Sequence, residues 1–143
     1  MFRSIPSKES LWFNYKKLPK RPDQRWEIED VIQLVFPKEF LPKQHEIAVE
    51  LIKFMLPYHK EGVVYGNQIE SFRKEKGFSN ATLRNLVIPK LVRIGLLTRE
   101  RVNPTGQTHK DKRHRMKLKL SHKFDMSLQR IGLQLETIIK TYE

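Results

Sequence analysis

The sequence predicts a mainly helical domain that carries one small β-hairpin and has an additional helix near each end. Three observations predict it. Several stretches repeat apolar residues at intervals of three and four, the spacing of a helix with one buried face. Residues 96–102 and 116–120 have instead the pattern of two short strands separated by a polar turn. The length of 143 residues fits one such domain with a core of its own.

Charge is the strongest compositional feature. The chain has 28 Lys and Arg residues against 16 Asp and Glu residues, a formal net charge of +12. Residues 97–120 alone contain eight basic and two acidic residues, so half of the excess lies in this segment. A localised excess predicts a surface that binds a polyanion, whereas an even distribution would indicate mainly solubility.

Other function classes lack their sequence signatures. The chain has no cysteine, which excludes disulfides and thiolate zinc sites. It has no signal-peptide pattern and no stretch of about 20 apolar residues, so we expect a cytoplasmic protein without membrane contact. His45-Glu46 would begin a zinc-protease motif, but Val49 stands where the second histidine is required. We therefore expect no enzyme activity, no metal or cofactor and no small-molecule effector.

The N-terminal arm, residues 1–22, has no regular periodicity. It contains three prolines, a run of basic residues and the interleaved aromatics Trp12, Phe13 and Tyr15. These aromatics indicate that the arm docks, either on its own domain or on a partner.

Two helices follow the arm. Asp23 is a suitable N-cap for a helix over residues 24–36, and Pro37 ends it. Pro42 then begins a helix that runs to about Leu56. The helix that begins at Pro42 is apolar nearly all round, which predicts that its neighbours bury it.

Residues 62–97 have the pattern of a short strand followed by two helices joined by a tight turn. A strand at 62–65 precedes a helix for which Asn67 is the expected N-cap, with Glu70 completing a capping box. Gly77 has the position of a C-terminal cap. Ser79 is the expected N-cap of a helix that reaches Ile94, with a kink at Pro89 because proline cannot bond to the Asn85 carbonyl.

From residue 44 to 120 the chain resembles the winged helix-turn-helix superfamily of DNA-binding domains. The resemblance rests on residues 67–73, the turn 76–79 and the segment from Asn80 through Leu91-Val-Arg-Ile-Gly-Leu-Leu97 that leads into a strand. It implies that the helix over about 80–94 is a recognition helix that enters the major groove. It also implies that the hairpin is a wing against the flanking backbone or minor groove.

The helix over 80–94 has the residue types that a recognition helix needs. Leu83, Val87, Leu91 and Ile94 form its apolar face. Asparagine pairs with adenine, and arginine pairs with guanine or phosphate. We therefore expect base contacts from Asn80, Thr82, Arg84 and Asn85, and a backbone contact from Ser79. The alternative is that these residues form an ordinary solvated helix face.

The predicted wing, residues 103–115, contains the densest cluster of cations. We expect backbone contacts from Lys110, Lys112, Arg113, His114 and Arg115, because cations on a protruding hairpin reach phosphates without being buried. The alternative is a solvated run that only prevents edge-to-edge pairing of strands. The pair His109 and His114 lies on an expected exposed loop without a carboxylate cluster, which argues against a metal site.

The C-terminal segment, residues 121–143, predicts a helix over about 125–142 with an apolar seam at heptad spacing. The seam consists of Phe124, Leu128, Ile131, Leu135, Ile138 and Tyr142. We expect it to form a homodimer interface, which would let two domains, each spanning residues 23–120, bind two half-sites. The alternative is that it packs on its own domain as one more core helix.

These patterns predict a sequence-specific double-stranded DNA-binding protein, a transcriptional regulator that acts as a dimer. Two alternatives stay open. One is a winged-helix module of a replication, plasmid-maintenance or RNA-binding machine. The other is a protein-interaction adaptor, against which the basic segment argues, although fold alone does not separate these classes.

Overall fold

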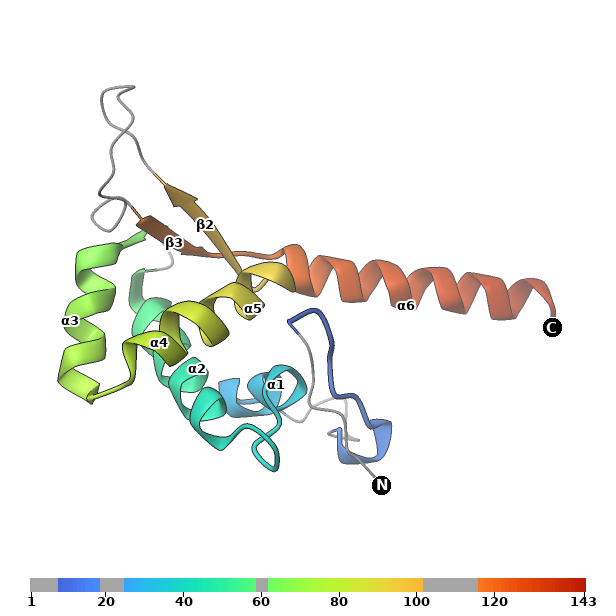
Figure 1. Cartoon of the computed structure of the whole chain (residues 1–143). Coiled ribbons are helices and arrows are strands. Elements are labelled where there is room, and N and C mark those ends of the chain that lie inside the picture. The colour runs from blue at the N-terminus through green and yellow to red at the C-terminus, as the bar shows by residue number, and fades with distance from the viewer. Residues whose placement is uncertain (1–7, 19–24, 59–61, 102–115) are drawn as a thin grey trace.

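The computed structural model describes residues 8–18, 25–58, 62–101 and 116–143. It is mainly helical with one small antiparallel sheet (Figure 1). The helices are α1 (Ile28–Val35), α2 (Pro42–Met55), α3 (Gly66–Lys76), α4 (Asn80–Thr82), α5 (Ile88–Arg93) and α6 (Lys123–Thr141), with short 3₁₀ turns η1 (Tyr15–Lys17) and η2 (Leu56–Tyr58) and a π-helical turn η3 (Leu83–Val87). The strands are β1 (Val64–Tyr65), β2 (Leu97–Arg101) and β3 (Met116–Leu120). No helix in these ranges is long and apolar enough to cross a membrane.

The sheet has the order β1-β3-β2, with both pairs antiparallel. Leu97 pairs with Leu120 and Arg101 pairs with Met116, so residues 102–115 connect the two strands of a hairpin, as the sequence predicts. Val64 pairs with Leu118, which adds β1 to the other edge of β3. Val64, Leu97, Met116 and Leu118 are all buried, and they share the sheet face that covers the helices.

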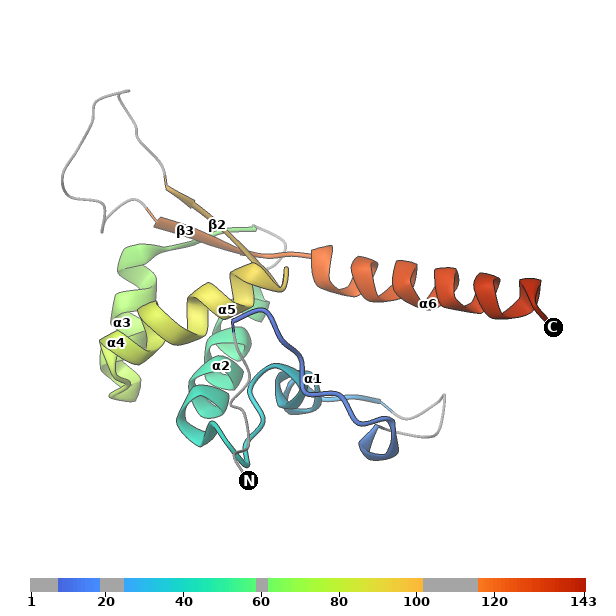
Figure 2. The same cartoon turned by 45° about the vertical axis from the view of Figure 1, so that its right-hand side comes forward.

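Helix α2 is the centre of the core, as its apolar composition predicts. Seven of its fourteen residues are buried. Six of them, all except His45, belong to one continuous cluster with buried residues of α1, α3, η3, α5 and all three strands. In Figures 1 and 2, α2 lies between α1 and the helical segment that runs from α4 to α5.

Two predicted helix starts are wrong. Helix α1 begins at Ile28 instead of residue 24, because Glu27 caps it and its own N–H donates to the Asp30 carboxylate at 2.8 Å. Helix α3 begins at Gly66, so Asn67 lies inside it and is not its N-cap. The N-cap is Tyr65, whose N–H donates to the Gln68 side chain at 2.8 Å. Tyr65 is both the last residue of β1 and the N-cap of α3, so no other residue between the strand and the helix serves as the cap.

Pro89 is accommodated by a widened turn. Because proline has no N–H, the ordinary bond to the Asn85 carbonyl is missing, and the N–H of Ile88 instead donates to the Leu83 carbonyl, five residues back. The helical segment therefore continues from Asn80 to Arg93 without ending at the proline.

Helix α6 projects away from the domain, in contrast to the core-helix alternative (Figures 1 and 2). Phe124 is buried at its start, where its N–H donates to the Gly95 carbonyl at 3.1 Å. Phe124 thus belongs to the packing of its own domain, so including it in a dimer seam was wrong. The other five seam residues are 42–86% exposed.

The junction between α5 and α6 predicts a strict requirement for glycine at position 95. Gly95 has φ +91°, and a Cβ there would lie 2.9 Å from the Lys123 Cβ and 3.0 Å from the Phe124 nitrogen. Gly95→Ala should lower the free energy of unfolding by about 2 kcal/mol or more, measured by urea denaturation. Gly77→Ala is the control, because φ is +72° there but nothing lies within 4 Å of the added Cβ. It should cost about 1 kcal/mol. Equal losses in the two variants would contradict the close contact at Gly95.

Candidate nucleic-acid interface

The turn between α3 and α4 has the caps that the sequence predicts. Gly77 adopts φ +72° and its N–H donates to the Lys74 carbonyl at 3.2 Å, while the N–H of Phe78 donates to the Arg73 carbonyl at 3.1 Å. Ser79 caps the next helix, since its Oγ accepts from the N–H of Thr82 at 3.2 Å. Phe78 packs against Phe72, with ring centroids 5.9 Å apart. The two helices are therefore joined by a turn with defined geometry.

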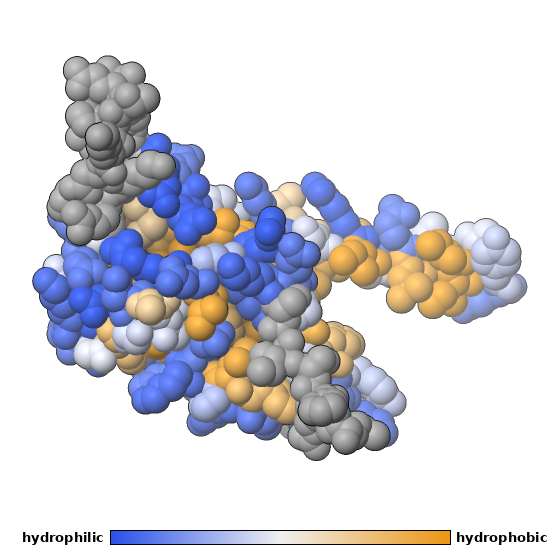
Figure 3. Space-filling model, viewed as in Figure 1, coloured by the Kyte–Doolittle hydropathy of each residue, from blue (hydrophilic) through white to orange (hydrophobic). Residues whose placement is uncertain are grey.

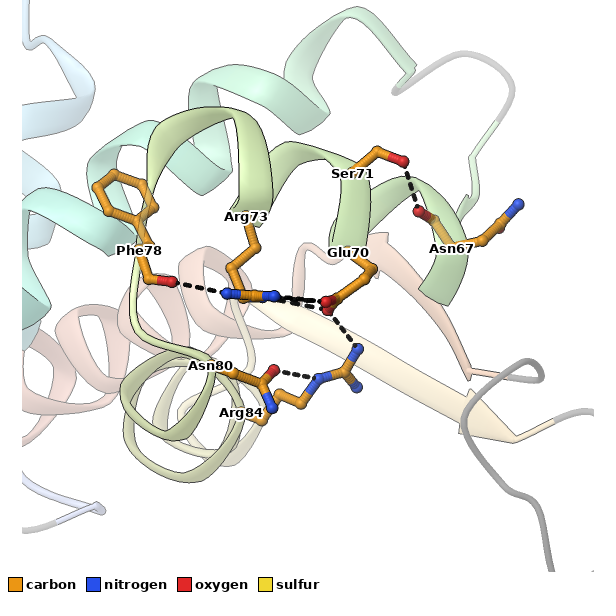
Figure 4. A network of polar contacts seen from close by, with 7 residues as sticks. All are labelled: Asn67, Glu70, Ser71, Arg73, Phe78, Asn80 and Arg84. Atoms are coloured by element: carbon orange, nitrogen blue, oxygen red, sulfur yellow. Dashed lines mark hydrogen bonds and ion pairs between the residues drawn. The ribbon is translucent and has the colours of Figure 1, made fainter.

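A polar network centred on Glu70 joins α3 to the helical segment from Asn80 to Arg93, which is called the second helix from here on (Figure 4). Arg73 donates through Nε and NH2 to both carboxylate oxygens, the shortest distance being 2.6 Å. Its NH1 donates to the Phe78 carbonyl at 3.0 Å, which fixes the turn. Arg84 approaches from the second helix, with its NH2 3.4 Å from the other Glu70 oxygen. The hydrogen bonds to its carboxylate lower the pKa of Glu70 to about 2, and those from Arg73 have the largest effect.

The network gives Arg84 an intrachain role. Besides Glu70, it bonds to Asn80, whose Oδ1 accepts from Arg84 Nε at 2.8 Å. Arg84 is partly buried, with 27% of its side chain exposed. The sequence predicts that Arg84 contacts bases; its position also suits it to orient Asn80. Sequence analysis missed this role because Glu70 lies 14 residues away in the chain.

The Asn80 amide is left with a defined polarity. Its oxygen accepts from Arg84, so its NH₂ group provides the hydrogens for a ligand. A bidentate contact to adenine needs both the oxygen and the NH₂ group. Because one lone pair of that oxygen is engaged, Asn80 presents its NH₂ donors more readily than its acceptor, which suits an acceptor such as phosphate oxygen or guanine O6 and N7.

The other predicted base contacts differ in exposure. Asn85 is exposed, and within the described part of the chain its side chain has no hydrogen-bond partner. Thr82 is half-buried, and Ser79 is exposed with its oxygen engaged in the cap. Leu86 is 42% exposed. The sequence did not single it out as a surface residue, because ideal helix spacing places it beside the apolar face. Asn85 is thus the polar side chain of this helix best placed to bind a base edge.

Lys90 turns inward from the same helical segment. It is 2% exposed, its Nζ donates to the Val35 carbonyl at 2.5 Å, and it lies over the Phe36 ring at 5.1 Å. Burial lowers its pKa to about 8. Its interior position follows from its spacing of seven residues from Leu83, a signal in the sequence that we did not use. Lys90 holds the segment against the end of α1 and is not available to a ligand.

The base of the hairpin presents cations that sequence analysis did not single out. Side chains alternate along β2, so Arg99 and Arg101 share a face with Leu97, the face directed toward the helices. Both are exposed, and neither has a carboxylate within salt-bridge distance in the described ranges. Lys117 and Lys119 pair with Glu100 and Thr98 on the opposite face. The predicted contacts Lys110, Lys112, Arg113, His114 and Arg115 lie outside the described residues.

The surface over α4 and α5 is mainly hydrophilic in the view of Figure 3, and the basic hairpin strands rise beside it. In the same ranges, Lys43, Lys53, Lys76, Arg93 and Lys140 are all within 4.0 Å of a carboxylate. Several cations away from the hairpin thus have a carboxylate partner, whereas Arg99 and Arg101 have none in these ranges. This combination fits a polyanionic ligand.

Comparisons with known proteins find no counterpart for this arrangement. No protein-family model matches the chain, and neither a curated protein nor a solved structure does.

The Glu70 network predicts a pH-dependent contribution to stability. Because the pKa of Glu70 falls from its ordinary value of 4.5 to about 2 on folding, its stabilisation is complete above pH 4.5 and is lost as pH decreases toward 2. Glu70→Gln should therefore lower the free energy of unfolding by about 1 kcal/mol at pH 7, and by progressively less between pH 4.5 and 3. Glu75→Gln is the control, an exposed position on α3 without an ion pair in the described ranges. A Glu70→Gln deficit that stays constant from pH 7 to 3 would contradict the charged network.

Proposed function

We propose that this chain is a winged helix-turn-helix protein that binds double-stranded DNA sequence-specifically as a transcriptional regulator. The supporting order is α3, a capped turn, a second helix and a β-hairpin with a basic connection. In this assignment the segment from Asn80 to Arg93 is the recognition helix and residues 103–115 form the wing.

One observation carries the proposal: an exposed Asn85 on the helix is combined with Arg99 and Arg101 on the helix-facing side of the hairpin, which have no carboxylate partner in the described ranges. Asn85 has both a donor and an acceptor for the edge of adenine in the major groove. Arg99 and Arg101 are exposed on the sheet face that is directed toward the helices, where we expect phosphates that flank the groove to lie. The Glu70 network holds the recognition helix to α3, which limits the reorganisation needed on binding.

We further propose that the protein acts as a homodimer through α6. Five seam residues, Leu128, Ile131, Leu135, Ile138 and Tyr142, are exposed on a helix that projects from the domain. Exposed apolar residues at heptad spacing are suited to helix pairing. A dimer would contact two half-sites and so gain affinity and specificity.

The DNA-binding proposal predicts that one face of the hairpin contributes to the salt dependence of binding. Affinity for a mixed-sequence DNA duplex should be measured by fluorescence anisotropy at several salt concentrations. Replacing Arg99 and Arg101 together by Ala should reduce the slope of log K against log salt by about 1.8, since each lost phosphate contact removes about 0.9.

The matched control replaces Lys117 and Lys119, which have the same charge on the opposite face of the hairpin. This pair should leave the slope nearly unchanged. Equal effects of both pairs would mean that binding depends on total charge and not on a docked face. Equal affinity for an RNA duplex would also argue against the proposal, because the A-form major groove is too narrow for a helix.

A further inference from the structure

The apolar seam of α6 is closed at its start and open along the rest of the helix. Phe124, its first residue, is 7% exposed, because its own domain packs on that side of α6 beside Gly95. Leu128, one turn later, is 42% exposed. The last four seam residues are 55–86% exposed on a helix that projects from the domain (Figures 1 and 2): Ile131, Leu135, Ile138 and Tyr142. A partner therefore has room on the seam from Ile131 onward.

The positions that flank the seam differ between its two sides. One flank contains Gly132 and Ile139, and the other contains Ser127, Gln134 and Thr141. None of these residues is charged, so no charge repulsion opposes pairing with an identical helix. Ile139 is 49% exposed, and within the described ranges nothing lies within 4 Å of a Cβ built on Gly132. One flank thus has a large apolar side chain and, two turns earlier, an open space.

We propose that two copies of this chain pair through α6 in antiparallel orientation, with Ile131 opposite the partner's Tyr142 and Leu135 opposite the partner's Ile138. The inference rests on the proposed homodimer and adds its orientation and register. Because the two-fold axis of such a pair brings equal flanks together, Ile139 of each copy lies over Gly132 of the other. The pair buries on the order of 1,000 Å² in total, the lower limit for a specific interface.

The buried Phe124 argues against a parallel pair. The start of a parallel partner's α6 would lie on the seam side of this α6 at Phe124, where this copy's own domain already packs. A parallel pair would also bring unequal flanks together and place Ile139 against the amide of the partner's Gln134. An antiparallel partner avoids both costs, because it brings only the free end of its α6 toward the domain.

The same burial selects the register. Two antiparallel seams keep their apolar contacts only when the partner is shifted by whole heptads. A shift of one heptad toward the domain would place the partner's Tyr142 against Phe124, which is already buried. A shift of one heptad away would leave only Ile138 and Tyr142 in contact. The proposed register is the one between these two, in which all four strongly exposed seam residues are buried.

Disulfide cross-linking tests the orientation and the register, because the chain has no cysteine of its own. Ile131→Cys protein is mixed with Tyr142→Cys protein and oxidised. The proposed register predicts a covalent product of twice 17.1 kDa, since the two cysteines face each other across the pair. Each variant alone is the matched control and should give little product, because identical positions are then about 17 Å apart along the helix axis.

The alternative arrangements give different products. A parallel pair would cross-link Ile131→Cys with itself and Tyr142→Cys with itself. A partner shifted one heptad toward the domain would cross-link Ile131→Cys with Leu135→Cys. Either pattern, in place of the mixed product of Ile131→Cys and Tyr142→Cys, would overturn the inference.

The open space at Gly132 provides a second test, by sedimentation at micromolar concentrations. Leucine is a better helix former than glycine, so Gly132→Leu should stabilise α6 in the monomer. It should nevertheless raise the dissociation constant of the dimer by about tenfold or more, because it fills the space that the partner's Ile139 occupies. Adding Ile139→Ala to this variant should restore part of the affinity. A monomeric native protein, or a dimer that Gly132→Leu leaves unchanged, would contradict the proposed pairing.

None of these measurements uses DNA, so the inference and the proposed DNA binding fail separately. Binding of the mixed-sequence duplex by a protein with the wrong cross-links would overturn only the pairing of α6. The predicted cross-links in a protein that does not bind the duplex would overturn only the DNA-binding function.

Discussion

The carboxylate of Glu70 is the interaction on which the candidate interface depends. It accepts hydrogen bonds from one arginine of its own helix and one of the next, and the first of these also bonds to the Phe78 carbonyl in the intervening turn. Three segments that fold locally are thereby held in one relative orientation. Because the carboxylate is only about one third exposed, water competes with these bonds less than it does at an open surface ion pair. The position of the second helix, and hence of Asn85, follows from this arrangement.

Some cations bond within the chain, and others are exposed without a carboxylate partner in the described ranges. Arg73 and Arg84 are bound to Glu70, and Lys90 is buried against the end of α1, where the carbonyls of the last turn favour a positive charge. Arg99 and Arg101 have no such partners in the described ranges. A net charge of +12 therefore says less about binding than the positions of the cations that lack a carboxylate partner in these ranges.

Local signals in the sequence were predictive, and relations between distant residues were not. Gly77 and Ser79 were identified as caps because a cap depends on its own residue and the next few. The strands of the hairpin and the extent of α2 followed from periodicity in the same way. The role of Arg84 was missed because its partner lies on another helix, and Asn67 was wrongly chosen as a cap because the adjoining strand supplies one. Phe124 belonged to the predicted seam by spacing, but only the packing at Gly95 shows which end of the seam the domain buries.

The central claim, that Asn85 of the second helix binds a base edge, is tested most directly by selecting duplexes from a randomised DNA pool. The native protein should enrich a common sequence. Asn85→Ala should relax one adenine position in it and lose about 1–3 kcal/mol of discrimination against random duplex. Asn80→Ala is the comparison within the same helix and should leave that adenine position unchanged. Failure of the native protein to enrich any sequence, or enrichment of the same sequence with equal strength by Asn85→Ala, would contradict the account.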